Sequence, residues 1–262
     1  MLQILKFQNQ LIILSYKRHF RKVAGSAIEG INHEKLGLKC QDYVHCFHYK
    51  DLSLISLSDG AGSYRHSALG AKLACEFTGN YFKDNYQSIF KKKDTEIKND
   101  FIKNLQKALF RSATKNNLAI RQLSSTLLFI VMYNEQYILG HIGDGVIGLN
   151  HKNSPLVLSK PKNAEYANQT FFTTSKNIKT HFELYKRDID FENNSGFILM
   201  SDGTAKSLYD FSTNKFSLGV KKLFEWIKFL DEKEMKNLLY VNQKNVFRKK
   251  TIDDCSIVMM TF

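Results

Sequence analysis

Proline is scarce in this chain, and no segment has the composition of a flexible linker. The 262 residues include only Pro155 and Pro161, and no Gly/Ser-rich or Pro-rich stretch divides them. A chain of this length buries enough surface to be stable without disulfides. The sequence therefore predicts one domain over residues 1–262, in which residues 1–20 can be an N-terminal extension.

Cysteine is also scarce, and its spacing excludes two kinds of small stabilised domain. The four cysteines show no CxxC pair, which argues against a zinc site and against a disulfide framework; they are Cys40, Cys46, Cys75 and Cys255. We expect the last three to be buried thiols in a cytoplasmic protein. Cys40 is not expected to act as a nucleophile.

Long apolar runs and the common nucleotide-binding and hydrolase motifs are missing as well. The apolar patches of residues 1–20 are interrupted by Lys6, Lys17 and Arg18, so they are too short and broken for a membrane span. The chain contains no P-loop, no GxSxG and no dinucleotide fingerprint. Any catalytic chemistry must therefore come from another arrangement of side chains.

Negative charge is in deficit, because 38 Lys and Arg face 25 Asp and Glu and leave a net charge of +13. The lysines are spread widely and form no single basic arm. A lysine-rich solvated surface is one interpretation of this pattern. The more specific interpretation is attraction to phosphorylated or nucleic-acid partners. Nucleic acid is disfavoured because no binding module and no basic stripe interleaved with aromatic residues is present.

The order of elements favours antiparallel sheets with helices outside them. Several strands follow one another without a helix between them, which argues against a doubly wound parallel sheet and for an α+β layered architecture. Helices are predicted at 63–90, 100–117, 217–230 and 231–242, with a polar loop at 91–100. Strands are predicted at 22–30, 42–49, 52–58, 124–133, 136–142, 146–149, 156–158, 170–174, 181–184, 196–200 and 251–262.

Three separate apolar runs end in Asp-Gly, and a fourth acidic pair stands directly before another run. The three are Asp59-Gly60, Asp144-Gly145 and Asp202-Gly203, and the fourth pair is Asp253-Asp254. One such Asp-Gly is an ordinary turn. Together they place several carboxylates at strand ends, where they can converge on a hard divalent cation, since Mg²⁺ and Mn²⁺ prefer oxygen ligands.

The motifs and their order resemble the metal-dependent protein phosphatases of the 2C type. The resemblance extends from about Gly25 to Met260. It is carried by Gln41-Asp42, Asp59-Gly60, Ser125-Thr126-Leu127-Leu128, Gly143-Asp144, Ser201-Asp202-Gly203 and Asp253-Asp254. The opening Gly30-Ile31-Asn32-His33 through Cys40-Gln41-Asp42, and Glu165-Tyr166-Ala167-Asn168, look like a bacterial branch of that family.

The resemblance implies a four-layer α-β-β-α sandwich of two antiparallel sheets flanked by helices. It also implies a signalling hydrolase, a protein serine/threonine phosphatase that uses metal-activated water and two or three Mg²⁺ or Mn²⁺ ions. Its partners would be a phosphorylated protein substrate and a cognate kinase. Asp59 and Asp202 would be the catalytic carboxylates.

The ligand set is implied in the same way. Asp59 would bridge two ions and the Gly60 carbonyl would complete one shell. Asp202 and Asp253 would hold the first ion, Asp42 would support the second, and Asp144 would support a third.

Three departures from the family pattern leave a second hypothesis open. Many members have Glu in place of Gln41, His in place of Ala61, and a phosphate-binding Arg in the slot of Gly37. Candidates to replace that Arg in substrate binding are His33, Lys35 and Lys39. The alternative is a non-catalytic relative of the same fold that binds phosphoproteins or a kinase.

Overall fold

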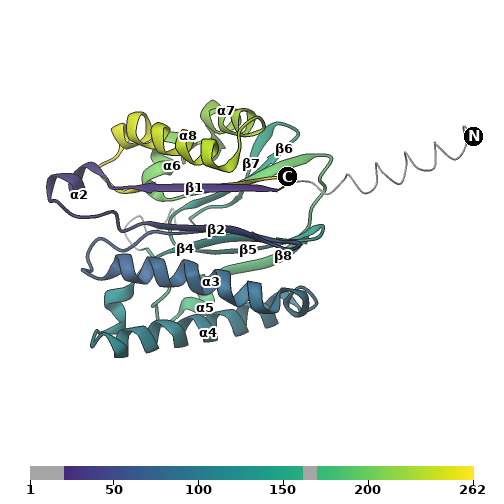
Figure 1. Ribbon diagram of the computed structural model, residues 1–262. Coiled ribbons are helices and arrows are strands. Elements are labelled where there is room, and N and C mark those ends of the chain that lie inside the picture. Colours follow the sequence, from purple (N-terminus) through teal and green to yellow (C-terminus); the bar gives the residue numbers. More distant parts are fainter. Residues whose placement is uncertain (1–20, 162–169) are drawn as a thin grey trace, which may run out of the picture.

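Two five-stranded antiparallel sheets lie face to face in the computed structural model, with helices on both outer faces (Figure 1). The structure describes residues 21–161 and 170–262. The predicted α-β-β-α sandwich is confirmed. Residues 1–20 and the segment Glu165-Tyr166-Ala167-Asn168 lie outside the described residues, so the expectations attached to them stay predictions.

Sheet A combines strands from both ends of the described chain, whereas sheet B is built from the strands between residues 43 and 188. Sheet A has the order β1 (Lys22–Ile28), β12 (Cys255–Thr261), β9 (Asn194–Met200), β6 (Val146–His151) and β7 (Ser154–Ser159). Sheet B has the order β2 (Tyr43–Tyr49), β3 (Leu52–Ser58), β4 (Leu127–Tyr133), β5 (Gln136–Ile142) and β8 (Glu183–Asp188).

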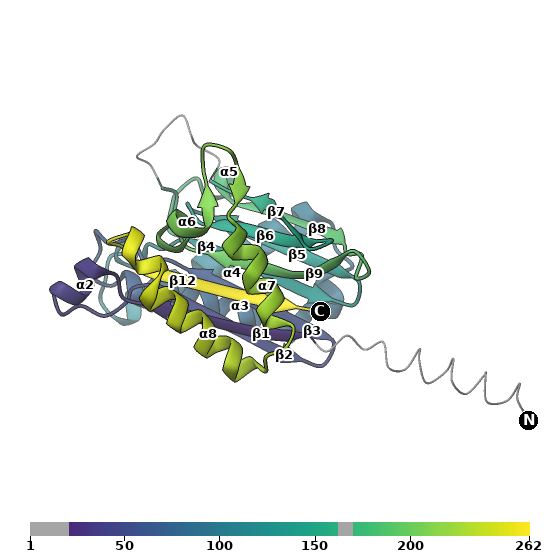
Figure 2. The same ribbon diagram turned by 90° about the horizontal axis from the view of Figure 1, so that it is seen from above.

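Long helices cover the outer face of each sheet. Sheet B carries α3 (Ser67–Ile89) and α4 (Asp94–Lys115), and sheet A carries α6 (Asp202–Leu208), α7 (Leu218–Ile227) and α8 (Glu232–Asn245). Figure 2 shows α7 and α8 lying across the strands of sheet A. The smaller elements are α2 (Ile31–Lys35), the 3₁₀ turns Ile120–Leu123 and Phe247–Lys250, α5 (Ile178–His181) and the hairpin of β10 (Tyr209–Asp210) and β11 (Lys215–Phe216). No helix in the described part of the chain is both long and apolar enough to cross a bilayer.

The central strands read as continuous apolar runs because both of their faces are buried. In β4, Leu127, Phe129 and Val131 pack toward α3 and α4. The alternate residues Leu128, Ile130 and Met132 pack between the two sheets. Because successive side chains of a strand point to opposite faces, this one strand contributes to two separate cores.

The predicted secondary structure is wrong in two regions, where polar residues obscure the hydrophobic periodicity. Residues 94–100 begin α4 instead of forming a loop, because the Glu96 side chain accepts the Lys93 backbone N–H and Ile97 is fully buried. The predicted strand 170–174 is irregular chain, and 181–184 divides between the end of α5 and the start of β8. Most other boundaries shift by a few residues.

β1 and β12 pair along their whole length, and their register brings the ends of the described chain together. Lys22 stands opposite Thr261, and Ile28 stands opposite Cys255. The end of β1 at Ile28 leads into α2, at the edge of the molecule opposite to the one where β12 finishes (Figure 1). The acidic motifs lie at the α2 edge.

Candidate metal centre

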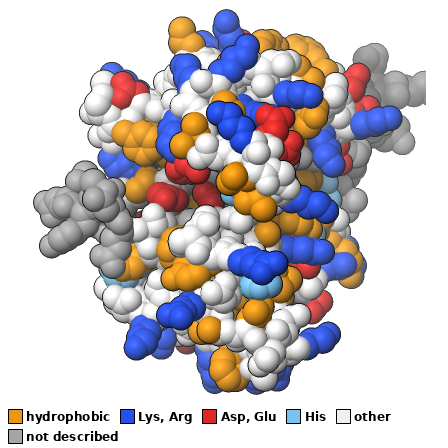
Figure 3. Space-filling model, turned by 90° about the vertical axis from the view of Figure 1, so that its left-hand side faces the viewer, with side chains coloured by type: hydrophobic (Ala, Val, Ile, Leu, Met, Phe, Trp, Pro, Cys, Tyr) orange, Lys and Arg blue, Asp and Glu red, His pale blue; other side chains and the backbone are white. Residues whose placement is uncertain are grey.

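The acidic motifs of the sequence meet at one edge of the two sheets. In sheet A the end of β9 lies beside the start of β12, with Met200 opposite Ile257. In sheet B the start of β2 lies beside the end of β3, with Tyr43 opposite Ser58. Antiparallel pairing thus delivers motifs that are far apart in sequence to the same place. Figure 3 shows acidic side chains gathered in a hollow of this edge, with lysines and arginines around them.

Asp59 is held by the strand next to its own. Its backbone N–H donates to Thr126 Oγ1 at 2.8 Å, and its carbonyl accepts from the Thr126 N–H at 2.8 Å. Gly60 pairs with Ser125, and a Cβ on Gly60 would lie 2.8 Å from the Gln41 carbonyl oxygen. The segment from Ser125 to Leu128 therefore fixes the Asp59-Gly60 turn, which explains why the two motifs occur together.

Asp42 is fixed from the opposite sheet. Its carboxylate is buried, and Oδ2 accepts a hydrogen bond from Ser256 Oγ at 2.7 Å. The backbone of Ser256 in turn exchanges hydrogen bonds with Ser201, which begins the helix that carries Asp202. One hydroxyl network thus ties the start of β12, the end of β9 and the start of β2 together.

Asp144 follows β5 in a turn that only glycine fits well. Gly143 has φ of 123°, and a Cβ there would meet the Thr126 side chain at 2.5 Å. Thr170 Oγ1 donates to Asp144 Oδ2 at 2.8 Å. Sequence reasoning did not identify Thr170, which has no motif of its own.

Burial and mutual repulsion raise the pKa values of these carboxyls. Burial is the largest cause for Asp59, followed by the negative charges of Asp42, Asp202 and Asp144. Burial also raises the pKa of Asp42 to about 8, against the hydrogen bond from Ser256. The pKa of Asp144 is raised by burial and then by the charge of Asp202. Shifts of this kind show that the four carboxylates act on one another.

The donor set fits a hard divalent cation. Oδ1 of Asp42 and Oδ1 of Asp144 are buried and have no hydrogen-bond partner among the residues that the structure describes. Burying an anionic oxygen without a partner costs several kcal/mol, and a divalent cation with oxygen ligands removes that cost. Within residues 21–161 and 170–262, no three His, Cys, Asp or Glu side chains already enclose a single ion position.

The adjacent carboxylates Asp253 and Asp254 have different roles. Asp254 is buried and accepts from the backbone N–H groups of Gly30 at 2.7 Å and Gln41 at 2.6 Å, and it lies 2.7 Å from His33 Nδ1. It therefore fixes the segment that leads to Asp42. The Asp253 carboxylate is 61% exposed and lies at the acidic edge. Sequence reasoning named the pair but could not identify this division.

Lys206 reaches into the acidic group from α6. Its Nζ lies 2.9 Å from Asp202 Oδ2 and 3.0 Å from Asp253 Oδ2. Sequence analysis did not single it out, although its place four residues after Asp202 in a helix is a signal for such a pair.

The residues proposed to replace the missing Arg do not form one group with the carboxylates. His33 is engaged with Asp254, whereas Lys35 and Lys39 are exposed on the segment around α2. Gly37, in the slot of that Arg, has φ of 64° at the turn after α2. Gln41 Oε1 accepts from Ser67 Oγ at 3.0 Å, so its amide binds α3 in this structure.

The thiol of Cys40 is close to the acidic residues but is poorly suited to nucleophilic chemistry. Burial, followed by the charges of Asp42 and Asp254, raises its pKa far above the ordinary range. A thiolate is the reactive form of cysteine. Its sequence position beside Gln41-Asp42 therefore carries no catalytic role.

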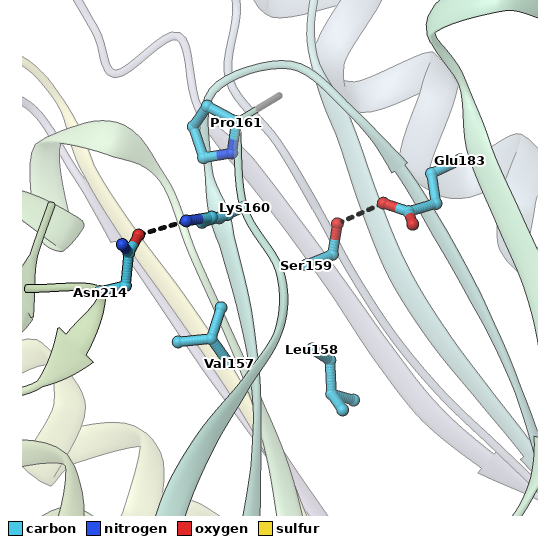
Figure 4. Close-up of a pocket in the computed structure, with 7 residues that line it drawn as sticks. All are labelled: Val157, Leu158, Ser159, Lys160, Pro161, Glu183 and Asn214. Atoms are coloured by element: carbon cyan, nitrogen blue, oxygen red, sulfur yellow. Dashed lines mark hydrogen bonds between the residues drawn. The ribbon is translucent and has the colours of Figure 1, made fainter. Parts of the chain in front are cut away.

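A pocket of about 460 Å³ opens at the end of β7 and the start of β8 (Figure 4). Its polar lining is already paired. Ser159 Oγ donates to Glu183 Oε2 at 2.6 Å and lies 2.6 Å from His141 Nδ1, and Lys160 bonds to Asn214.

We expect the metal-free protein to lose stability as pH rises from about 4, the ordinary pKa of Asp, through neutrality. The folded state keeps Asp42 and Asp59 protonated at pH values where the unfolded chain ionises them, because their folded-state pKa values are raised. The folded state then binds more protons, so the free energy of unfolding falls with pH until the folded-state pKa is passed. Urea unfolding in a chelator at pH 5 and pH 8 measures this fall. Asp42→Asn should flatten it, and an equal fall in that variant would contradict the assignment.

Comparison with known proteins identifies a family and relatives that this chain resembles in sequence. Residues 29–240 match the family described as Protein phosphatase 2C. Serine/threonine-protein phosphatase 3 of Escherichia coli (strain K12) is 27% identical over 174 residues, which is 63% of this chain and 67% of that protein.

Solved structures share the fold at low sequence identity. The Mycobacterium tuberculosis serine/threonine phosphatase PstP/Ppp has a TM-score of 0.65 at 14% identity, over 92% of this chain and 98% of the other. Staphylococcus aureus Stp1 has a TM-score of 0.64 at 13% identity, over 92% and 94%. The catalytic domain of PstP in complex with two manganese ions has a TM-score of 0.63 at 15% identity, over 92% and 97%.

Proposed function

Because this chain belongs to the protein phosphatase 2C family, we propose that it is a metal-dependent protein serine/threonine phosphatase. The observation that carries the proposal is the convergence of Asp42, Asp59, Asp144 and Asp202 at one edge, with two buried carboxylate oxygens that lack a hydrogen-bond partner in the described residues. Divalent cations bound by these oxygens would offset the repulsion between the carboxylates. The relatives named serine/threonine phosphatases and the manganese complex support the same activity.

In this proposal each carboxylate holds metal from a position that the fold sets. Asp59 and the Gly60 carbonyl stand on the turn bound to β4, Asp42 on the turn bound to Ser256, and Asp202 at the start of α6. Asp253 and Asp144 complete the set of ligands, which would hold two or three Mg²⁺ or Mn²⁺ ions. When bound, these cations lower the pKa of water and neutralise phosphoryl oxygens, so that phosphomonoester hydrolysis needs no protein nucleophile.

The remaining groups position the substrate and the site. The net charge of +13 attracts a phosphorylated protein, and Lys35 and Lys39 are exposed beside the site segment. We place the reaction in the cytoplasm, in signalling with a cognate kinase, because all four cysteines are free thiols, as a reducing compartment favours.

One observation favours a non-catalytic binding protein as the second candidate. The Gln41 amide is turned to Ser67 and not to the acidic group. A site with one ligand fewer holds its second ion less tightly. In that case the fold would bind a phosphoprotein without hydrolysing it.

Phosphate release from phosphoserine and phosphothreonine peptides tests the proposal directly. We expect turnover in millimolar Mn²⁺ and none in excess chelator, with the thiol reagent iodoacetamide having little effect because Cys40 takes no part. Peptide binding measured by fluorescence anisotropy, with no phosphate release in Mn²⁺ or Mg²⁺, would select the binding protein. Equal turnover with and without chelator would refute metal dependence.

A further inference from the structure

Lys206 makes a bridge between two of the proposed metal ligands. Its ammonium contacts Oδ2 of Asp202 at 2.9 Å and Oδ2 of Asp253 at 3.0 Å. The first contact joins residues one helical turn apart in α6. The second joins α6 to the acidic pair that lies directly before β12, 47 positions along the chain.

The bridge balances charge in the metal-free protein. Asp202 repels Asp42, Asp59 and Asp144 across the same edge, as the raised pKa values of those three carboxyls show. The Lys206 side chain is partly exposed, and a lysine amine is charged at neutral pH. It therefore contacts the two carboxylates as an ammonium.

Lys206 contacts both of the residues that would hold the first ion. Asp202 and Asp253 are the two residues assigned to the first ion, and each has one carboxylate oxygen in contact with Nζ. A divalent cation held by the same two carboxylates would compete with the ammonium for them, because the two cations repel each other.

We propose that Lys206 is an internal cation that occupies the Asp202–Asp253 position in the metal-free protein and competes with the first divalent ion for it. The inference rests on the proposed function, since it takes those two residues as metal ligands. It adds that this chain itself sets the metal concentration at which the site loads. The lysine keeps the acidic edge together without metal, and for the same reason it weakens metal binding.

Isothermal titration with Mn²⁺ tests the competition without using activity. We expect Lys206→Met to bind its first Mn²⁺ on the order of tenfold more tightly than wild type, because two partly exposed ion pairs are no longer broken on binding. Lys206→Arg keeps the charge and should bind with wild-type affinity or more weakly. Lys72→Met is the matched control, since Lys72 also pairs with a carboxylate four residues away, Glu76, on an exposed helix face.

Thermal unfolding in chelator tests the other half of the inference. We expect Lys206→Met to unfold about 2–4 °C below wild type, and Lys72→Met to differ less. Unchanged or weaker Mn²⁺ affinity in Lys206→Met, alongside clear binding by wild type, would overturn the inference and leave the proposed function standing. No Mn²⁺ binding to wild type or to any variant would overturn the proposed function, and the competition with it.

Discussion

Asp59→Asn is expected to lower kcat/KM for a phosphopeptide by about 10³-fold in saturating Mn²⁺. An amide at this position keeps the turn but removes the negative charge that would bridge two cations. Loss of one preorganised electrostatic group in an active site has an effect of this order. The main-chain bonds to Thr126 do not involve the side chain, so the fold should persist.

The same substitution should stabilise the protein when metal is absent. In chelator Asp59 is a buried carboxyl whose pKa is raised by burial and then by Asp42, Asp202 and Asp144. A neutral amide removes the cost of burying a group that ionises in the unfolded chain at neutral pH. Asp188→Asn is the control, because Asp188 ends β8 and its exposed carboxylate accepts a hydrogen bond from the Gln136 side chain. Full Mn²⁺-dependent turnover by Asp59→Asn, with Asp188→Asn unchanged, would falsify the assignment of the bridging carboxylate.

Asp254→Ala is expected to destabilise the protein by about 3–5 kcal/mol, the range found when one partner of a buried charged group is removed. The substitution leaves the backbone N–H groups of Gly30 and Gln41 without their acceptor, and frees His33. Urea unfolding measures this loss. Because the released segment leads to Asp42, divalent-metal affinity should fall in the same variant.

Asp253→Ala provides the matched comparison, since it changes the neighbouring residue of the same type. Its carboxylate is 61% exposed and its contact is the partly exposed Lys206, so we expect less than about 1 kcal/mol of destabilisation. Mn²⁺ affinity should nevertheless fall, because a ligand is lost. Equal stability of the two variants would show that the roles assigned to the pair are wrong.

The strands could be predicted from sequence because buried strands are rich in apolar residues. β3 and β5 were predicted with the boundaries that the structure has, since runs buried on both faces leave a continuous apolar signal. The start of α4 could not be predicted in the same way. Its first turns are polar apart from Ile97, and they are held by the hydrogen bond that the Lys93 backbone N–H donates to the Glu96 side chain.

The acidic motifs could be predicted as a group from the sequence. The separate role of each carboxylate within the group could not. Asp253 and Asp254 are adjacent and chemically identical, and they lie in the bend that precedes β12. Which of the two faces the hollow depends on the Gly30–Gln41 segment, more than 200 positions earlier in the chain. Likewise, the turning of Gln41 toward Ser67 depends on where α3 packs.

The full-length pairing of β1 with β12 has a practical consequence for handling this protein. Residues 22 and 261 sit side by side at the far end of the sandwich from the acidic hollow. A fluorescent label or an affinity tag joined after Phe262 would lie at the end of the sandwich remote from the site that a phosphopeptide would enter. Surface attachment through that end should accordingly leave the hollow facing outward into the assay solution.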